Sequence, residues 1–535
     1  MYLPGLMSIP AVDRDEARFA QASRQMLESG DYVVPRVQGR PRLNKPPVIY
    51  WLQAGAAHVL TRGDPLHDAV WMYRVPSFLA AVCVVMLTWR LGGAMYGPFA
   101  GVLSAAIVGL SPVFFWEAHQ ARADMALVAA TLCAVWALWN CTAPPDQPAR
   151  RPPWRWVLLL WAAIALGVMT KGPVTPMVVG LGSLALCLMT RSWRWLTSLR
   201  PLLGLLILAA AVAPWVYLVS KQVGWNVYLS TIIDETLGRS LEPKEGHGGF
   251  PGYHAVLLPA LLFPGSLLVG LAAWEAWKAR RLERPALFLL CMIAPSWLVF
   301  EAVGTKLPHY TMPLYPMLAI LTARVCCVGA AAFSRYLTLW PVRWATTLWL
   351  LAVPGFVLLG AAVFAANLPR MQAIGALSAG AGIAAVFLGS AAWALRRRDL
   401  PLLMAAGLLA AVPAFAGFGD GLHRLNDIWI SRELAAHLRK LDPGAQVGIA
   451  AVGSDPARAW VGFHEDSLIF ETRGRIQRIE PADLDAWFAR NPGGYAVVPA
   501  AMLINNPAYI PIAAVDGFNY SKGKRTYLCI AGERP

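Results

Sequence analysis

The sequence is poor in charged residues for its length. Charged residues make up 14% of 535 positions, about half of the share in ordinary soluble domains, whereas hydrophobic residues make up 57%. A water-soluble core does not need so much apolar surface, so one large soluble domain is excluded. Apolar stretches of about twenty residues recur up to about residue 418, each long enough to cross a hydrocarbon layer of roughly 30 Å. The bilayer is therefore the expected solvent for most of the chain.

Cysteine motifs and a concentrated basic patch are also missing. Five of the eight cysteines lie inside apolar runs, Cys529 alone lies in the tail, and no CxxC pair occurs. This pattern argues against a disulfide framework and against a cysteine-based metal site. The net charge of +15 comes from short basic clusters between apolar runs. Such clusters are typical of cytoplasmic anchoring, so nucleic acid is not an expected partner.

Twelve apolar segments are predicted to cross the membrane as helices. Their approximate bounds are 70–93, 98–116, 123–141, 155–170, 173–190, 201–220, 254–277, 285–303, 312–333, 344–366, 373–395 and 400–418. Met1 to Pro10 is apolar but too short to span, and it lacks the basic start of a signal peptide. Either the chain begins late in a thirteenth helix or a first span is missing. No internal repeat is found.

The loops between these segments alternate in charge, and the alternation predicts the orientation. Basic clusters lie near residues 150–155, 191–200, 278–284, 335–343 and 396–398, and the positive-inside rule places these loops in the cytoplasm. The outward-facing parts are then residues 11–69, the turns at 117–124, 170–173 and 305–310, the loop 221–253, and the C-terminal tail. Every segment with unusual chemistry falls on this outer side.

The sequence predicts two domains, a transmembrane domain over 1–418 and a soluble outward-facing domain over 419–535. In the first outer loop, residues 11–69, two amphipathic helices are expected at the interface, over Asp15–Ser29 and Pro46–Leu60. The tail suggests a small α/β unit. Its expected strands are Gln446–Val452, Ser467–Phe470, Tyr495–Pro499 and Arg525–Ala531, and its expected helices are Asp427–Lys440 and Pro481–Arg490.

An acidic cluster opens the first outer loop as Asp13-Arg14-Asp15-Glu16, followed at helical spacing by Arg18. A carboxylate that is partly desolvated at a membrane face can have a raised pKa and act as a general base on a hydroxyl. The alternative is a solvated helix N-terminus whose acids complement the helix dipole. Glu16 is also considered as a residue that contacts an acceptor.

Cations and hydrogen-bond donors recur at the outer ends of the predicted spans. The set comprises Arg18, Lys45, Arg122, Lys171, Lys306, His309 and Tyr310, with Asp124 as a second acid. Together they would form a ring around an anionic group, which is what a phosphoryl leaving group needs. Each cation alone can instead be an ordinary helix-end anchor, and Arg122 with Asp124 can be a structural pair.

The 221–253 loop contains carboxylates and His247, which can bind a divalent metal in principle. Their spacing matches no compact metal motif, so a substrate loop is the preferred interpretation. No metal site and no required cofactor are predicted.

Six motifs resemble, in order, one known family. They are Asp13-Arg-Asp-Glu-Ala-Arg-Phe-Ala, Glu28-Ser-Gly-Asp-Tyr-Val-Val-Pro, Lys45-Pro-Pro-Val-Ile-Tyr-Trp, Ala121-Arg-Ala-Asp-Met, Thr170-Lys-Gly-Pro and Lys306-Leu-Pro-His-Tyr-Thr-Met-Pro-Leu-Tyr-Pro. The pattern resembles the bacterial aminoarabinose lipid A transferases and their relatives related to protein O-mannosyltransferases. The resemblance spans most of the membrane portion.

This resemblance implies a membrane helical bundle of the C-type glycosyltransferase (GT-C) fold and an inverting transfer of sugar from a polyprenyl phosphate. It implies that Asp15 is the catalytic carboxylate, that Asp124 is a second essential acid, and that Lys45, Arg18 and Tyr310 contact the donor phosphate. Family members carry a glutamate before the lysine of the Lys-Pro-Pro motif, which is part of a metal site in some of them. Asn44 stands there in this chain, which argues against the same metal.

The expected enzyme therefore lies in a bacterial inner membrane with its site facing the periplasm. Aminoarabinose, galacturonic acid, hexoses and mannose remain open as the sugar, and lipid A, another glycolipid or a protein as the acceptor. A transporter or flippase is the main alternative, and it predicts charges near the bilayer midplane and two related halves. The ionisable residues here cluster at one face instead. A scaffold subunit is a third alternative.

Overall fold

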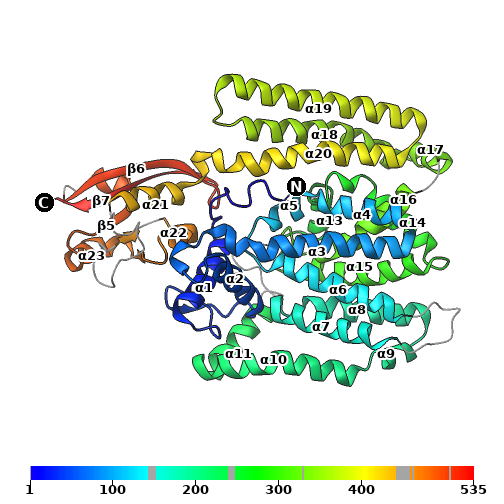
Figure 1. Cartoon of the computed structure of the whole chain (residues 1–535), viewed down its shortest axis with the longest axis horizontal. Helices are drawn as coiled ribbons and strands as arrows, with labels where there is room; N and C mark the ends of the chain where they lie inside the picture. Colours follow the sequence, from blue (N-terminus) through cyan, green and yellow to red (C-terminus); the bar gives the residue numbers. More distant parts are fainter. Residues whose placement is uncertain are drawn as a thin grey trace.

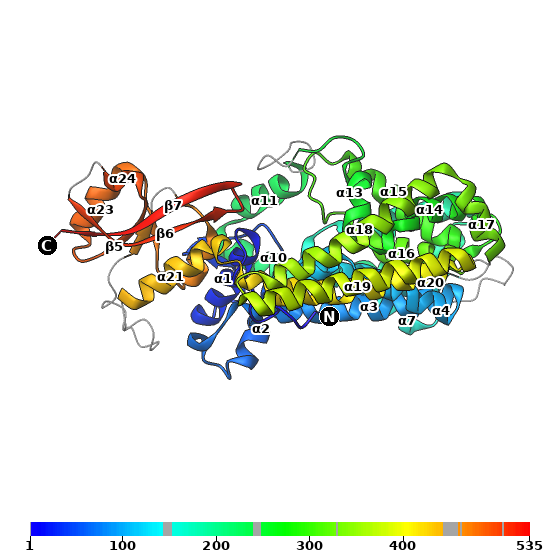
Figure 2. The same cartoon turned by 90° about the horizontal axis from the view of Figure 1, so that it is seen from above.

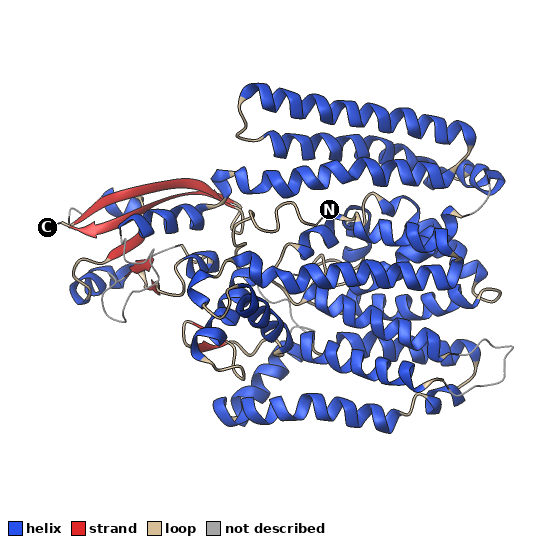
Figure 3. Cartoon of the chain, in the orientation of Figure 1, coloured by secondary structure: helices blue, strands red, loops and turns tan. Residues whose placement is uncertain are grey.

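The chain forms a bundle of long helices with a small sheet-containing domain at one end (Figures 1 and 3). The computed structural model describes residues 2–142, 152–238, 248–327, 330–441, 458–460, 463–504 and 508–534. Within these ranges, eight helices are long and apolar enough to cross a membrane. They are α3 (Val70–Tyr96), α6 (Asp124–Cys141), α7 (Trp154–Lys171), α10 (Pro201–Val223), α15 (Arg284–Ala302), α18 (Trp340–Ala365), α19 (Arg370–Arg397) and α20 (Leu400–Gly421). Each coincides with a span predicted from the sequence.

Three other predicted spans are shorter or bent. α4 (Pro98–Gly109) and α5 (Pro112–Ala118) meet at 64° and bring the count among the described helices to nine if the pair is one span. α8 (Val174–Thr190) is apolar but shorter, as is the segment formed by η4 (Met312–Leu314) and α16 (Tyr315–Cys326). A proline opens α5, where the missing amide hydrogen is tolerated in a first turn but ends the preceding helix.

The prediction of one continuous helix over 254–277 is wrong. α13 (Tyr253–Leu261) ends before Pro264, a short 3₁₀ turn η3 (Gly265–Leu268) follows, and α14 (Val269–Ala279) continues the chain. Proline has no amide hydrogen and its ring clashes with the preceding turn, so Pro264 interrupts the helical hydrogen bonding. An apolar run by itself does not reveal such a break.

The two predicted interfacial helices are confirmed as α1 (Asp15–Ser29) and α2 (Val48–Leu60). A two-stranded hairpin, β1 (Arg36–Val37) with β2 (Arg40–Pro41), lies between them. Both helices lie at the end of the bundle, between it and the C-terminal domain (Figures 1 and 2). The first outer loop is therefore placed to connect the two parts of the molecule.

The C-terminal domain is built on a five-stranded sheet of order β4-β3-β5-β7-β6. Its strands are β3 (Arg458–Trp460), β4 (Gln477–Arg478), β5 (Tyr495–Pro499), β6 (Tyr509–Asn519) and β7 (Lys524–Glu533), and its helices are α21 (Ile430–Leu441), α22 (Asp466–Glu471), α23 (Leu484–Arg490) and α24 (Ala501–Ile504). The expected strands at β5 and β7 and the expected helices at α21 and α23 are confirmed. The long strand β6, which pairs with β7 in antiparallel register, was not predicted.

One predicted strand of the tail is wrong, because residues 467–470 belong to helix α22. Four apolar or small residues in a row carry no period that separates a buried strand from a buried helical turn. Here the segment is buried against α1 and α21, and that packing favours a helix over a strand. The strand expected over residues 446–452 lies outside the described residues.

The remaining elements are short turns and helices at the ends of the longer ones. They are η1 (Pro65–His67), α9 (Arg194–Ser198), α11 (Trp225–Ile233), the π-helical turn η2 (Asp234–Gly238), α17 (Ala330–Thr338), η5 (Leu422–Arg424), η6 (Asn426–Ile428) and η8 (Pro481–Asp483). The predicted domain boundary after residue 418 falls in the last turn of α20, and η5 and η6 lead from there into the tail.

A fully buried ion pair fixes the start of α1 to the bundle. The Arg74 guanidinium on α3 donates to both Glu16 carboxylate oxygens at 2.7 and 2.8 Å, and both side chains are 0% exposed. The backbone amides of Val12 and Ala121 donate to the same carboxylate at 2.8 Å each. Both carboxylate oxygens of Glu16 therefore accept hydrogen bonds from groups of three segments of the chain. Glu16 has a structural role and is not available to contact an acceptor.

Loss of Glu16 should destabilise the fold. Removing one partner of a buried pair leaves a buried charge without compensation and costs roughly 3–5 kcal/mol, so we expect Glu16→Ala to lower the free energy of unfolding by about that amount. Thermal denaturation of the purified protein in detergent measures the change. Glu28→Ala is the control, since Glu28 lies on the same helix but is 34% exposed beside Arg473, and exposed pairs contribute below about 1 kcal/mol. Equal losses in the two variants would contradict this assignment.

Candidate functional site

Two cavities meet at the end of the bundle beside α1. The first is polar, has a volume of about 340 Å³, and lies between the first outer loop, the turn before α6 and the loop before η4. The residues on its wall that the sequence predicted as site residues are Asp15, Glu16, Arg18, Lys45, Arg122, Asp124, Lys171, His309 and Tyr310. Residues from four separate outer turns thus converge in one place.

The second cavity is mostly apolar and has a volume of about 620 Å³. Side chains from α6, α7, α8, α10 and α15 form its wall, among them Leu127, Met169, Met177, Trp215 and Phe300. It shares six wall residues with the polar cavity, namely Asn44, Lys45, Asp124, Lys171, His309 and Tyr310. The charged cavity and the apolar cavity therefore adjoin each other at these six residues.

Asp124 lies at the junction of the two cavities, on the first turn of α6. Its side chain is 6% exposed, and its Oδ1 accepts a hydrogen bond from Lys171 Nζ at 2.5 Å. The Lys171 ammonium, which ends α7, also lies 5.4 Å from the centre of the Tyr310 ring. Burying a carboxylate is costly unless it is paired, so the Lys171 ammonium stabilises the buried Asp124 carboxylate in addition to lining both cavities.

Arg122 contacts four ionisable side chains in or beside the polar cavity. Its guanidinium lies 3.1 Å from Glu117 Oε1, 3.4 Å from Asp15 Oδ2 and 3.7 Å from Asp124 Oδ2. It also lies 3.2 Å from His309 Nε2. The pairing of Arg122 with Asp124 considered from the sequence exists, but it is one of several contacts of a shared cation.

Asp15 faces the polar cavity with its side chain 46% exposed. Burial raises its pKa, but the positive charges of Arg122, Arg42 and Arg18 outweigh that effect, so the pKa of Asp15 lies below its usual value. The expectation of a raised pKa is therefore wrong for this residue. It holds for Asp13, whose pKa burial raises to about 7 against the hydrogen bonds from Ser467. Asp15 is ionised at neutral pH.

Lys45 stands beside the polar chamber with an unexpected partner. Its Nζ lies 3.3 Å from Glu235 Oε2, and the Asn44 amide donates to Glu235 Oε1 at 3.0 Å. An ammonium group cannot ligate a cation, and the neutral Asn44 amide stands where the resemblance implies a glutamate, so this position lacks the anionic oxygen ligand that a divalent metal prefers. No group of three or more metal-ligating side chains is gathered anywhere among the described residues.

Three predicted site residues are placed differently from the rest. Arg18 borders the polar cavity, but its Nε donates to Asp466 of the C-terminal domain at 2.6 Å. Lys306 is buried and donates to the carbonyls of Gly249 and Phe250 at 3.0 Å each, outside both cavity walls. His247 lies outside the described residues. The structure thus brings Arg18 to the site's edge and leaves Lys306 as a support for the preceding loop.

Arg42 is a site residue that the sequence reasoning missed. Its guanidinium lies 3.9 Å from Asp15 Oδ1 and 5.2 Å from the centre of the Phe19 ring. The signal was available in its spacing, because Arg42 lies three residues before Lys45 in the same short segment between the interfacial helices. Glu117 and Glu235 also contact site residues, but their contacts to Arg122 and Lys45 depend on folding and have no local signature.

The chain is a multi-pass membrane protein with the GT-C fold. A crystal structure of ArnT from Cupriavidus metallidurans bound to undecaprenyl phosphate matches 98% of this chain and 95% of its own, with a TM-score of 0.72 at 20% identity. The apo structure of the same protein matches with a TM-score of 0.73. These matches confirm the fold class predicted from the sequence.

Sequence comparison points the same way. Residues 44–218 match the family model described as dolichyl-phosphate-mannose-protein mannosyltransferase. The undecaprenyl phosphate-alpha-4-amino-4-deoxy-L-arabinose arabinosyl transferase of Pseudomonas aeruginosa is 26% identical, covering 97% of this chain and 94% of the relative. A second transferase of that description, from Sodalis glossinidius, is 28% identical over 59% of this chain and 56% of its own length. The resemblance drawn from the six motifs is confirmed.

The surroundings of His309 predict its protonation state. Burial lowers its pKa to about 3, and Arg122 and Lys171 oppose protonation further while Asp124 favours it. Because the pKa is lowered, the imidazole is neutral at every pH above that value and should not titrate between about pH 5 and 8, where an ordinary histidine does. Imidazole nitrogen-15 chemical shifts in histidine-labelled protein measure this, with His309→Gln to assign the signal. A His309 signal with a midpoint near pH 6.5 would contradict the geometry.

Proposed function

We propose that the protein is an inverting glycosyltransferase that moves a sugar from a polyprenyl-phosphate donor to an acceptor on the periplasmic side of a bacterial inner membrane. The observation that carries the proposal is the junction of the polar and apolar cavities, where Lys45, Lys171 and Tyr310 line both. A polyprenyl-phosphate sugar has an apolar chain, an anionic phosphate and a polar sugar in that order. The two cavities offer complementary surroundings in the same order.

In this proposal the donor phosphate binds at the junction of the polar and apolar cavities. Lys45 and Lys171 bring positive charge, and the Tyr310 hydroxyl can donate a hydrogen bond. Both lysines have carboxylate partners in the structure, Glu235 at 3.3 Å and Asp124 at 2.5 Å. A phosphate that enters therefore meets ammonium groups that are already oriented, which lowers the cost of arranging them during the reaction.

In this proposal the acceptor binds in the polar cavity beside Asp15. Its oxygen attacks the anomeric carbon while the bond from that carbon to the phosphate oxygen breaks, which inverts the anomeric centre. The departing polyprenyl phosphate takes the electron pair, and its negative charge is stabilised by the cations at the junction. Asp15 is ionised and accepts the proton of the acceptor hydroxyl. Arg122 orients Asp15 at 3.4 Å.

Similarity supports the donor class. The arabinosyl transferase of Pseudomonas aeruginosa is named for an undecaprenyl phosphate carrier, and the matching crystal structure of ArnT contains that lipid phosphate. The acceptor of this chain is lipid A, another glycolipid or a protein. A transporter or flippase is not favoured, because the ionisable wall residues lie in the first outer loop, at helix ends and in the connecting turns rather than along the spans.

Substitution of Asp15 tests the catalytic assignment. Asp15→Asn keeps the shape of the side chain but removes its proton acceptor, so we expect kcat to fall by about 10²- to 10⁴-fold. The affinity for polyprenyl phosphate should stay unchanged, because Asp15 does not line the apolar cavity. Transfer from labelled polyprenyl-phosphate sugars into membrane lipids measures kcat, and binding of the lipid phosphate is measured separately. Asp64→Asn, an exposed acid of the same outer loop beside His67, is the control. Equal transfer by Asp15→Asn and wild type would refute the role.

Metal removal tests the prediction that transfer needs no divalent metal at Asn44. Since the Asn44 amide and the Lys45 ammonium surround Glu235 with donors, we expect transfer to be unchanged by EDTA and by added magnesium. Asn44→Glu places a second carboxylate beside Glu235, and transfer by this variant should become responsive to divalent cations. A wild-type enzyme that loses activity in EDTA and regains it with a divalent cation would contradict this account.

A further inference from the structure

The C-terminal domain contacts α1, the helix that carries Asp15, just before its start, in its first turn and towards its end. Figure 1 shows α22 beside α1, between the bundle and the sheet of the tail. In the first turn of the helix, Arg18 Nε donates to Asp466 at 2.6 Å. Each end of the helix makes several contacts to the tail.

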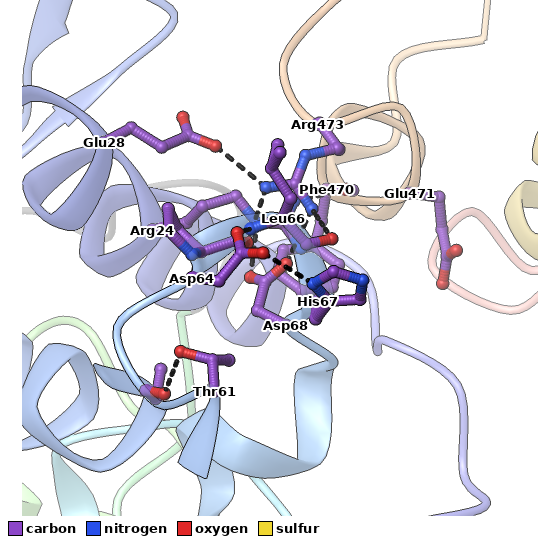
Figure 4. A network of polar contacts seen from close by, with 12 residues as sticks. Arg24, Glu28, Thr61, Asp64, Leu66, His67, Asp68, Phe470, Glu471 and Arg473 are labelled. Carbon is purple, nitrogen blue, oxygen red and sulfur yellow. Dashed lines mark hydrogen bonds and ion pairs between the residues drawn. The ribbon is translucent and has the colours of Figure 1, made fainter. Parts of the chain in front are cut away.

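The end of α1 is anchored through a buried charge cluster centred on Asp68. Asp68 is 0% exposed and accepts hydrogen bonds from Arg24 Nε and from Arg473 of the tail, each at 2.7 Å (Figure 4). Arg473 also lies 3.0 Å from Glu28, and Arg24 donates to the Phe470 carbonyl at 2.7 Å while stacking on its ring at 3.8 Å. Because two arginines share one buried carboxylate, the tail and the first outer loop form one unit here.

The start of α1 is held by hydroxyl groups of the tail. The Asp13 backbone amide donates to the Tyr520 hydroxyl at 2.8 Å. The Ser467 amide donates to the Asp13 carboxylate at 3.2 Å, and the Ser467 hydroxyl donates to the same oxygen. The Arg14 guanidinium donates to the Ser521 carbonyl at 3.2 Å. Both residues that precede Asp15 are therefore bonded to the C-terminal domain.

Arg14 has a backbone conformation that explains why such contacts are needed. Its φ is 65° and its ψ is −103°, in a region that residues with a Cβ rarely adopt. Its side chain does not cap the helix. Strained residues of this kind persist only where their surroundings fix them, and they are frequent beside reactive groups. The tail bonds on Asp13 and Arg14 supply that fixation one residue before Asp15.

We propose that the C-terminal domain is a working part of the transfer site. In this proposal Tyr520 and Ser467 are positioning residues that hold Asp13, two residues before Asp15, so that the Asp15 carboxylate points at Arg122 in the polar cavity. The proposal rests on the proposed function. Neither residue lines the polar or the apolar cavity, so each acts through Asp13 rather than on the substrate, Tyr520 at its backbone amide and Ser467 at its carboxylate. Release of these bonds would let Arg14 relax and move Asp15.

The test compares two tyrosines of the same domain. Tyr520→Phe removes the hydroxyl that accepts from the Asp13 amide, and Tyr509→Phe is the matched control, because its hydroxyl donates to Asp485 on the far side of the tail. Displacement of a reacting group by about 1 Å can cost 10²-fold, so we expect Tyr520→Phe to lower kcat by about 10- to 100-fold. The KM for the polyprenyl-phosphate sugar and the melting temperature should match those of Tyr509→Phe. Ser467→Ala should lower kcat in the same way, and Ser467→Thr, which keeps the hydroxyl, should restore it.

A second readout separates this proposal from the proposed function. Amide hydrogen exchange of residues 12–18 does not depend on any reaction, and it should be faster in Tyr520→Phe than in wild type and in Tyr509→Phe. Faster exchange there with a lowered kcat and an unchanged KM supports the proposal. Exchange equal in all three proteins, or a kcat loss shared by Tyr509→Phe, would overturn it. If wild type fails to transfer any polyprenyl-phosphate sugar, the proposed function fails, whereas the exchange data still report whether the tail holds Asp15.

Discussion

The carboxylate of Asp124 is placed where a bare charge would not be stable, in the first turn of an apolar helix with almost no exposed surface. The cations Lys171 and Arg122 neutralise it, and the neutral His309 imidazole lies 3.5 Å from it, so the start of α6, the end of α7 and the loop before η4 come together here. Because each of these groups would be costly to bury alone, the cluster forms as a whole. That constraint fixes the place where the apolar cavity ends and the polar cavity begins.

The first outer loop and the tail complete the site from the other side. α1 brings Asp15 opposite Arg122, and the segment before α2 brings Arg42 and Lys45. The buried pair of Glu16 and Arg74 ties this loop to the bundle. The site is thus assembled from parts far apart in the chain, and its proposed chemistry depends on their relative placement more than on any single motif.

Much of this arrangement could be predicted from the sequence, because two signals are local. The length of the apolar runs predicted the long helices. The alternation of basic loops predicted that Asp15, Lys45, Asp124, Lys171 and His309 lie on one side of the membrane, and the structure brings them together. The break at Pro264 and the helix over 466–471 were missed, since an apolar run does not reveal either. The pKa of Asp15 was also misjudged. Burial was foreseen, but two of the three arginines that outweigh it, Arg42 and Arg122, come from other segments than α1.

Contacts across long sequence distances account for the rest. Arg18 was expected to face a phosphate, yet it bonds Asp466, which lies 448 residues further along the chain. Lys306 was expected at the same phosphate, yet it supports the carbonyls of Gly249 and Phe250. Both cations stand in the motifs that suggested the family, and neither local spacing nor charge distinguishes a ligand contact from a structural one. Only the folded positions of their partners make that distinction.

The most direct measurement of the central claim is an electron cryomicroscopy structure of this protein in nanodiscs with a polyprenyl phosphate bound. The account predicts phosphate density between Lys45 and Lys171 at the junction of the two cavities, with the lipid chain running between α7, α8 and α10. Phosphate density at the opposite end of the bundle, or a lipid chain outside the apolar cavity, would contradict it.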